Sequence, residues 1–316
     1  MEKELRDQAA KLLEEGTVDF IVGFAAGTLK HTTTPLITGD KDATSSLVIN
    51  PFISNNLATY ALEISGRLGI VAKGCDSRSI VSLIQDKQIT RQDIVILGIP
   101  CSGLIDLKKV EKLSGKERDE IDDIAVVEDK VVITIGSEKR EVTAATVLFD
   151  HCLGCELQIP QEYDFLIQGP ANEIRDNEAS REKIQELKQM FPDQRWAYWK
   201  QQFSRCIRCY ACRQVCPACF CERCFVEESQ PRWVSPVSLW QDNLIFQAVR
   251  AIHVAGRCTD CGECERVCPV DIPLRSLSKE MYDLVGEMFD YKTGMNAGAP
   301  PLMTAYELTE VESLIR

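Results

Sequence analysis

The sequence predicts an α/β N-terminal domain, with a mostly parallel sheet and an added antiparallel meander, followed by an all-α C-terminal domain. Three observations lead to this prediction. Strand-like apolar runs alternate with helical patterns up to about residue 100, which is typical of a parallel sheet covered by helices on both faces. Short β-branched runs then occupy residues 124–147. Beyond residue 170, apolar positions recur at helical spacing.

The N-terminal elements follow from the spacing of apolar residues. An amphipathic helix is predicted over residues 4–15, and Gly16 ends it. Among the later segments, short continuously apolar runs are predicted to be strands. Longer amphipathic segments are predicted to be helices. The predicted strands are 18–24, 47–49, 68–72 and 93–97, the predicted helices are 53–64 and 77–85, and the meander is predicted over 124–127, 131–135 and 141–147.

Four cysteines mark the ends of predicted strands. Cys75 and Cys101 each follow a strand of the parallel sheet, and Cys152 and Cys155 form a C-x2-C pair directly after the meander. Ligands of parallel sheets bind beyond the carboxyl ends of the strands. The four thiols therefore make a candidate metal site, although a free cysteine is often simply a small buried apolar residue.

The order of motifs in this region resembles a known family. The segments 12–22, 70–75, 95–103 and 151–156 are similar to the beta-subunit family of deazaflavin-reducing hydrogenases and formate dehydrogenases. The resemblance covers most of residues 10–170. It implies that Cys75, Cys101, Cys152 and Cys155 bind one 4Fe-4S cluster beside FAD. The chain departs from the family at 157–160, where Leu-Gln-Ile-Pro stands in place of an Asp-containing motif.

The C-terminal half contains the spacing C-x2-C-x2-C-x3-C-P twice. This is the spacing of a two-cluster ferredoxin, in which three close thiolates bind one 4Fe-4S cluster and the fourth Cys binds the other cluster. Zinc is the alternative, but it needs only four ligands and does not require the third Cys. We therefore assign Cys206, Cys209, Cys212 and Cys268 to one cluster, and Cys258, Cys261, Cys264 and Cys216 to the other.

The surrounding segments complete a helical domain. A helix is predicted over 236–255, between the two motifs, and another begins at Leu274. Residues 201–275 resemble the helical two-cluster ferredoxins of heterodisulfide reductase and succinate dehydrogenase iron-sulfur subunits. The domain boundaries predicted are 1–170 for the α/β domain, 171–200 for a charged helical linker, 201–275 for the ferredoxin domain and 276–316 for a docking tail. Cys219, Cys221 and Cys224 have no assigned role.

Composition excludes several classes of protein. The net charge of -12 argues against nucleic acid, because phosphate binding needs clustered Lys and Arg. The N-terminus lacks the apolar stretch of a signal peptide, so we expect a cytoplasmic protein with reduced cysteines. No apolar run is long enough to cross a bilayer, and direct membrane insertion is not expected.

These observations predict an iron-sulfur electron-transfer subunit of a cytoplasmic oxidoreductase complex of anaerobic metabolism. Its partners would be other subunits of a hydrogenase, a formate dehydrogenase or a heterodisulfide-reductase-like complex. No side chains suggest a nucleophile with its base. The alternative is a reductase subunit that holds FAD and exchanges hydride with a soluble carrier such as a deazaflavin or NAD(P), since the cofactors would carry that chemistry.

Overall fold

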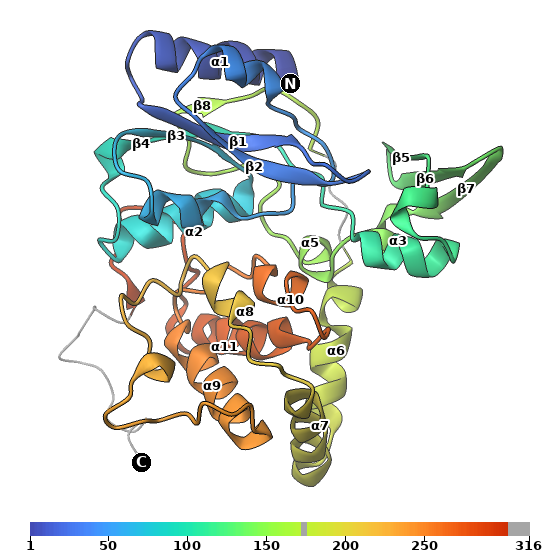
Figure 1. The fold of residues 1–316 in the computed structure, drawn as a ribbon, viewed down its shortest axis with the longest axis vertical. Helices are drawn as coiled ribbons and strands as arrows, with labels where there is room; N and C mark the ends of the chain where they lie inside the picture. The colour runs from blue at the N-terminus through green and yellow to red at the C-terminus, as the bar shows by residue number, and fades with distance from the viewer. Residues whose placement is uncertain (172–175, 303–316) are drawn as a thin grey trace.

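The computed structural model describes residues 1–171 and 176–302, which form an α/β region and a helical C-terminal region (Figure 1). Together the two regions contain a five-stranded mixed sheet, a separate three-stranded sheet and the helices around them. No helix among these residues is long and apolar enough to cross a membrane.

The five-stranded sheet forms the centre of the N-terminal region, with the strand order β2-β1-β3-β4-β8. The pairings β1–β3, β3–β4 and β4–β8 are parallel, and β1–β2 is antiparallel. β3 is buried along its whole length, as expected for a strand covered on both faces. The strands are β1 (Phe20–Ala26), β2 (Thr33–Thr38), β3 (Leu68–Ala72), β4 (Ile94–Gly98) and β8 (Phe165–Leu166).

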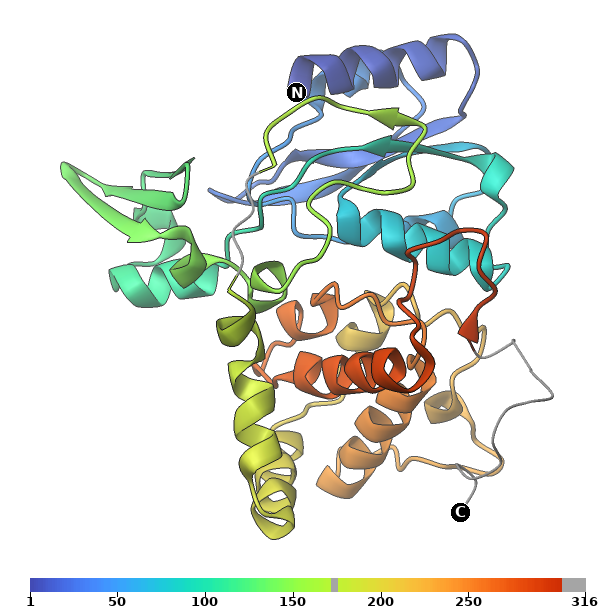
Figure 2. The ribbon, with the colours of Figure 1, turned by 180° about the vertical axis from the view of Figure 1, so that it is seen from behind.

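Helices cover the two faces of this sheet. α1 (Glu2–Glu14) packs on one face through Leu5, Ala9 and Leu12. α2 (Gly74–Gln85) lies on the other face, between the sheet and the helical region (Figures 1 and 2). Because α2 is covered on both sides, nearly all of its side chains are buried, polar ones included.

A small lobe projects from the side of the α/β region (Figure 1). It contains the antiparallel meander predicted from the sequence, with the strand order β5-β6-β7, and α3 (Leu107–Ser114). Gly115 ends α3 in the left-handed conformation. The meander strands are β5 (Asp123–Val127), β6 (Lys130–Ile135) and β7 (Glu138–Thr143).

The C-terminal region is built from helices around a small apolar core. Six buried residues form this core, and Cys212 and Cys268 are two of them. α7 packs against α9, and Trp199 stacks on Phe203 within α7. The helices are α6 (Asn177–Gln189), α7 (Pro192–Ser204), α8 (Ala211–Gln214), α9 (Trp240–His253), α10 (Glu263–Arg266) and α11 (Leu274–Phe289).

Several predicted elements differ from the observed ones. The predicted strand 47–49 is wrong, since Leu47 makes only an isolated bridge with Ala25. The predicted helix 53–64 is a 3-10 helix over Leu57–Leu62. The last meander strand ends at Thr143, where α4 (Ala144–Val147) begins, so the C-x2-C pair follows helical turns and not a strand. The predicted helix 236–255 begins only at Trp240, after the extended segment that contains Pro236.

The segment after α11 returns to the α/β region. Arg78 of α2 donates from Nε to the Thr293 carbonyl oxygen at 2.9 Å, and Gln85 donates to the carbonyl oxygens of Asn296 and Ala299. This part of the predicted docking tail therefore binds its own chain. The rest of that tail, 303–316, lies outside the described residues.

Candidate metal centres

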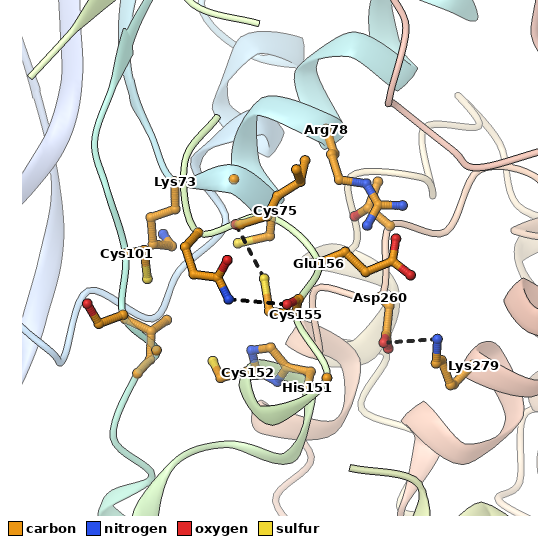
Figure 3. Close-up of a pocket in the computed structure, with 18 of the residues that line it drawn as sticks. Lys73, Cys75, Arg78, Cys101, His151, Cys152, Cys155, Glu156, Asp260 and Lys279 are labelled. Carbon is orange, nitrogen blue, oxygen red and sulfur yellow. Dashed lines mark hydrogen bonds and ion pairs between the residues drawn. The ribbon is translucent and has the colours of Figure 1, made fainter. Parts of the chain in front are cut away.

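The four N-terminal cysteines meet in one pocket (Figure 3). Cys75 lies in the first turn of α2, and Cys101 follows β4. Cys152 lies in α5 (Asp150–Leu153), and Cys155 follows it. The pocket that they line also contains Lys73 and, from the helical region, Thr259 and Asp260.

Close backbone approaches hold this pocket together. The Cys101 amide donates to the Gln158 carbonyl oxygen at 2.8 Å, which brings the segment after Cys155 against the end of β4. A Cβ atom on Gly74 would lie 2.1 Å from the Leu157 carbonyl oxygen, so the start of α2 admits only glycine there. The segment 157–160, where the chain departs from its family, therefore forms a wall of the cysteine pocket.

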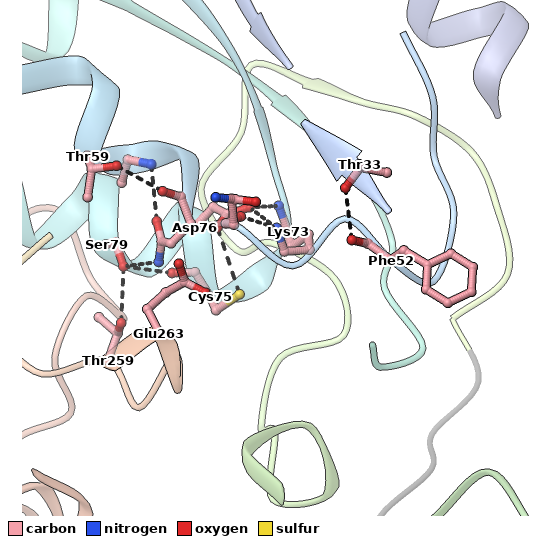
Figure 4. A network of polar contacts seen from close by, with 12 residues as sticks. Thr33, Phe52, Thr59, Lys73, Cys75, Asp76, Ser79, Thr259 and Glu263 are labelled. Carbon is pink, nitrogen blue, oxygen red and sulfur yellow. Dashed lines mark hydrogen bonds and ion pairs between the residues drawn. The ribbon is translucent and has the colours of Figure 1, made fainter. Parts of the chain in front are cut away.

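A buried ion pair stands beside the thiols (Figure 4). Lys73 and Asp76 are 1% and 0% exposed, and the distance from Lys73 Nζ to Asp76 Oδ2 is 2.7 Å. Burial disfavours the charged form of Lys73, but the Asp76 carboxylate, and then Cys75, raise its pKa above the ordinary value. Lys73 Nζ also donates to the Asn55 carbonyl oxygen at 3.0 Å. A fixed positive charge thus stands next to Cys75.

The donor set of this pocket fits an iron-sulfur cluster. Burial raises the pKa of Cys101 to about 11, while a Gly103 amide and the Lys73 charge act in the opposite direction. Burial likewise raises the pKa of Cys75 and Cys152. Four thiols around one pocket are the ligand number of a 4Fe-4S cluster. The adjacent Lys73 charge favours their ionisation.

The two C-terminal cysteine motifs adopt the same backbone shape. In both loops the third and fifth residues have positive φ: Arg208 and Tyr210 in the first, and Asp260 and Gly262 in the second. Each loop then enters a short helix, α8 or α10. A bulky residue such as Tyr210 rarely adopts this conformation, and such strain clusters at functional sites.

The thiols group across the two motifs. Burial raises the pKa of Cys206, and the charges of Cys212, Cys268 and Cys209 raise it further. Burial also raises the pKa of Cys258 and Cys264 to about 12, and both interact with Cys216. Each triplet therefore has the fourth Cys of the other motif as its neighbour, which is the arrangement that the ferredoxin spacing predicts.

Hydrogen bonds to sulfur accompany both groups. The Asp260 amide donates to Cys258 Sγ at 3.4 Å, and the Ile272 amide donates to Cys268 Sγ at 3.4 Å. Gln247 Nε2 donates to Cys212 Sγ at 3.6 Å. Such bonds stabilise thiolates and tune the potential of a bound cluster.

The N-terminal pocket and the second C-terminal motif share a wall. The Ser79 hydroxyl of α2 bonds to the Cys75 carbonyl oxygen and lies 3.1 Å from the Thr259 hydroxyl (Figure 4). His151 packs closely against Gly262: a Cβ atom added to Gly262 would lie 2.0 Å from Nδ1 of His151. Burial lowers the pKa of His151 to about 3, and the Arg275 charge adds to this effect, so the imidazole is neutral.

The cysteines were predictable from spacing, but their partners were not. Lys73, Asp76 and His151 lie within two residues of a pocket cysteine, but nothing in the sequence marks them as partners of the thiols. Thr259 reaches the pocket only through the contact between the two regions. Among the described residues, no three His, Cys, Asp or Glu side chains converge as the ligands of a single metal ion would. Cys219 lies beside Cys216, whereas Cys221 is exposed.

Comparison with known proteins agrees with this description. The model of the 4Fe-4S dicluster domain matches residues 201–272. The F420-dependent formate dehydrogenase subunit beta of Methanocaldococcus jannaschii is 25% identical, over 75% of this chain and 76% of that protein. The F420-dependent formate dehydrogenase 1 subunit beta of Methanococcus maripaludis is also 25% identical, over 92% of this chain and 90% of that protein.

A solved structure of the F420-reducing NiFe hydrogenase complex from Methanosarcina barkeri contains a chain that is 14% identical, with a TM-score of 0.40. The match covers 64% of this chain and 86% of that one. The family resemblance noted in the sequence is confirmed by the curated relatives and by the dicluster match. The chain is a homologue of the beta subunits of F420-dependent formate dehydrogenases and carries a 4Fe-4S dicluster domain in its C-terminal part.

Proposed function

We propose that this chain is an iron-sulfur electron-transfer subunit of an oxidoreductase complex, and that it holds three 4Fe-4S clusters. The observation that carries the proposal is the gathering of twelve cysteines into three groups of four. The N-terminal group is Cys75, Cys101, Cys152 and Cys155, and the two ferredoxin groups are those assigned from the sequence.

The three groups lie in a defined order. Thr259 and Asp260 line the N-terminal pocket and belong to the Cys258–Cys264 loop, so the N-terminal cluster would neighbour the cluster of that loop. The second cluster would take Cys216 as a ligand from the first motif. The other cysteines of that motif, Cys206, Cys209 and Cys212, would bind the next cluster. Cys209 is exposed. Electrons would therefore pass between the α/β region and an exposed edge near Cys209.

The clusters supply the redox chemistry, and the protein supplies ligands, charges and an order of sites. Residues 1–170 would form the α/β domain, 171–200 the helical linker, 201–275 an all-α dicluster ferredoxin and 276–316 the tail. α7 (Pro192–Ser204) extends across the linker boundary and packs against α9, so this linker would be attached to the ferredoxin domain. Partners would be other subunits of a redox complex, as the names of the relatives state for those proteins.

A cavity supports the alternative function. A space of about 480 Å³ lies next to the N-terminal pocket and shares His151 with it. Phe52 and Phe149 line it, together with four basic side chains and four carboxylates: Lys108, Arg118, Arg266, Arg275, Asp106, Asp150, Glu265 and Asp271. The aromatic rings suit a planar cofactor such as FAD, whose polar groups would meet the mixed charges of the lining. With FAD bound there, the chain would exchange hydride with a soluble carrier.

Iron and flavin per chain, measured on anaerobically purified protein, test the proposal. About twelve irons per chain with cluster signals on reduction would support the electron-transfer subunit. Protein without redox-active iron would refute it. Stoichiometric FAD in addition would favour the hydride-exchanging alternative, and iron without flavin would leave the relay alone.

A further inference from the structure

Arg250 of α9 is a buried cation with an unused donor. It is 4% exposed, and its Nη2 atom has no hydrogen-bond partner. It lines a cavity of about 330 Å³ with Arg213, Arg257 and Cys219, and no carboxylate is among the described residues that line this cavity. Burying a guanidinium without a counter-charge is costly. An anionic group is therefore expected beside Arg250.

The neighbours of Arg250 come from both ferredoxin groups. Gln247 connects Arg250 to Cys212, and Cys219, which lines the cavity with Arg250, donates its amide to the Cys216 carbonyl oxygen at 3.0 Å. Cys212 belongs to the first group and Cys216 to the second. Arg250 thus lies between the two sets of ligands.

A second side chain fixes this position. Arg250 Nε donates to Gln247 Oε1 at 3.1 Å, and Gln247 Nε2 donates to Cys212 Sγ at 3.6 Å. Gln247 is 1% exposed and lies one helical turn before Arg250 on α9. Gln247 therefore holds the guanidinium near Cys212, and because both side chains are buried the charge of Arg250 is weakly screened.

We propose that Arg250 is a positioning residue that sets the reduction potentials of both ferredoxin clusters from between them. The inference rests on the proposed function. A cluster with four thiolates is anionic and gains a further negative charge on reduction. A fixed cation therefore stabilises the reduced form and raises the potential. Because Arg250 neighbours both groups, it would raise the two potentials together.

The test is a redox titration followed by electron paramagnetic resonance, with Arg250→Gln in the full chain. We expect the one-electron reduction equilibrium of both ferredoxin clusters to weaken about tenfold, a shift of about 59 mV to more negative potential. The N-terminal cluster should not shift. Arg250→Lys should recover most of the change, and Arg232→Gln, which removes an exposed charge from the same domain, should change neither potential.

Unchanged potentials in an iron-loaded Arg250→Gln protein would overturn the inference. If that variant loses its iron, Arg250→Met, which keeps the apolar stem, carries the same measurement. Loss of iron from both neutral variants but not from Arg250→Lys would support the proposed role of the positive charge. Loss of iron from Arg250→Lys as well would overturn the inference. Wild-type protein without iron would instead refute the proposed function.

Discussion

The α/β region and the C-terminal region build their cysteine sites in opposite ways. The N-terminal thiols come from segments far apart in the chain, and the large sheet core brings them together. The C-terminal thiols come from two local loops around a smaller core, in which six of the described residues are buried and two of these are cysteines: Phe203, Cys212, Phe246, Cys268, Ile272 and Leu274. We therefore expect the fold to shape the first site and bound clusters to complete the second.

Removal of iron should separate the two regions most clearly. Since metal-binding energy is folding energy where no large core exists, the iron-free chain should lose amide protection in α9 while β3 and β4 keep theirs. Hydrogen exchange before and after anaerobic chelation measures this difference. Equal loss in both regions would contradict the comparison.

Single ligand variants should give unequal iron losses. Cys264→Ala removes a ligand from a domain whose two clusters share one small core, so we expect loss of both, about eight irons per chain. Cys101→Ala should cost about four irons and leave the ferredoxin signals intact, because the sheet persists. Iron analysis of the two purified variants measures this difference. A loss of about four irons from each variant would contradict the expectation that the two ferredoxin clusters depend on one core.

Lys73→Met should destabilise the α/β region by about 3–5 kcal/mol, since breaking a buried ion pair leaves Asp76 without its partner. The effect should appear as faster hydrogen exchange in β3 and α2. The double variant Lys73→Met with Asp76→Asn should recover part of the loss. Lys3→Met, at an exposed position, is the control.

Asn243→Ala should have a smaller effect, confined to the C-terminal region. Asn243 is 1% exposed and donates to the carbonyl oxygens of Phe203 and Cys206 at 3.0 and 2.9 Å. Leaving them unsatisfied should cost about 2 kcal/mol. Faster hydrogen exchange in α7 and α9 would show this loss of stability, and Gln241→Ala, at an exposed position, is the control. Unchanged hydrogen exchange would refute the stabilising role of Asn243.

Cys221→Ser should have the smallest effect of all. Cys221 is exposed and lies outside the three groups of thiols, so this variant should keep its full iron content and its potentials. A loss of about four irons would show that Cys221 is a ligand and would change the assignment of the groups.

Features that depend on local spacing could be predicted from the sequence. The two ferredoxin loops have positive φ at the same two positions because the residues of each loop are close in the chain. β3 occupies the predicted range, and α11 begins at the predicted residue. The sequence also indicated the four N-terminal cysteines through their places after predicted elements. At 47–49 and 53–64 the local preference for strand or helix was weak, and tertiary packing determined the conformation. The elements predicted there were wrong.

Contacts between distant groups, by contrast, depend on how the elements pack in three dimensions. Strand order places Cys75 beside Cys101, and the contact between the two regions brings Thr259 and Asp260 to the N-terminal pocket. The burial of Lys73 against Asp76 and of Arg250 between the two ferredoxin groups likewise depends on long-range packing. Spacing along a chain specifies local geometry, but the environment of a charge depends on the elements that cover it, and those elements are remote in the sequence.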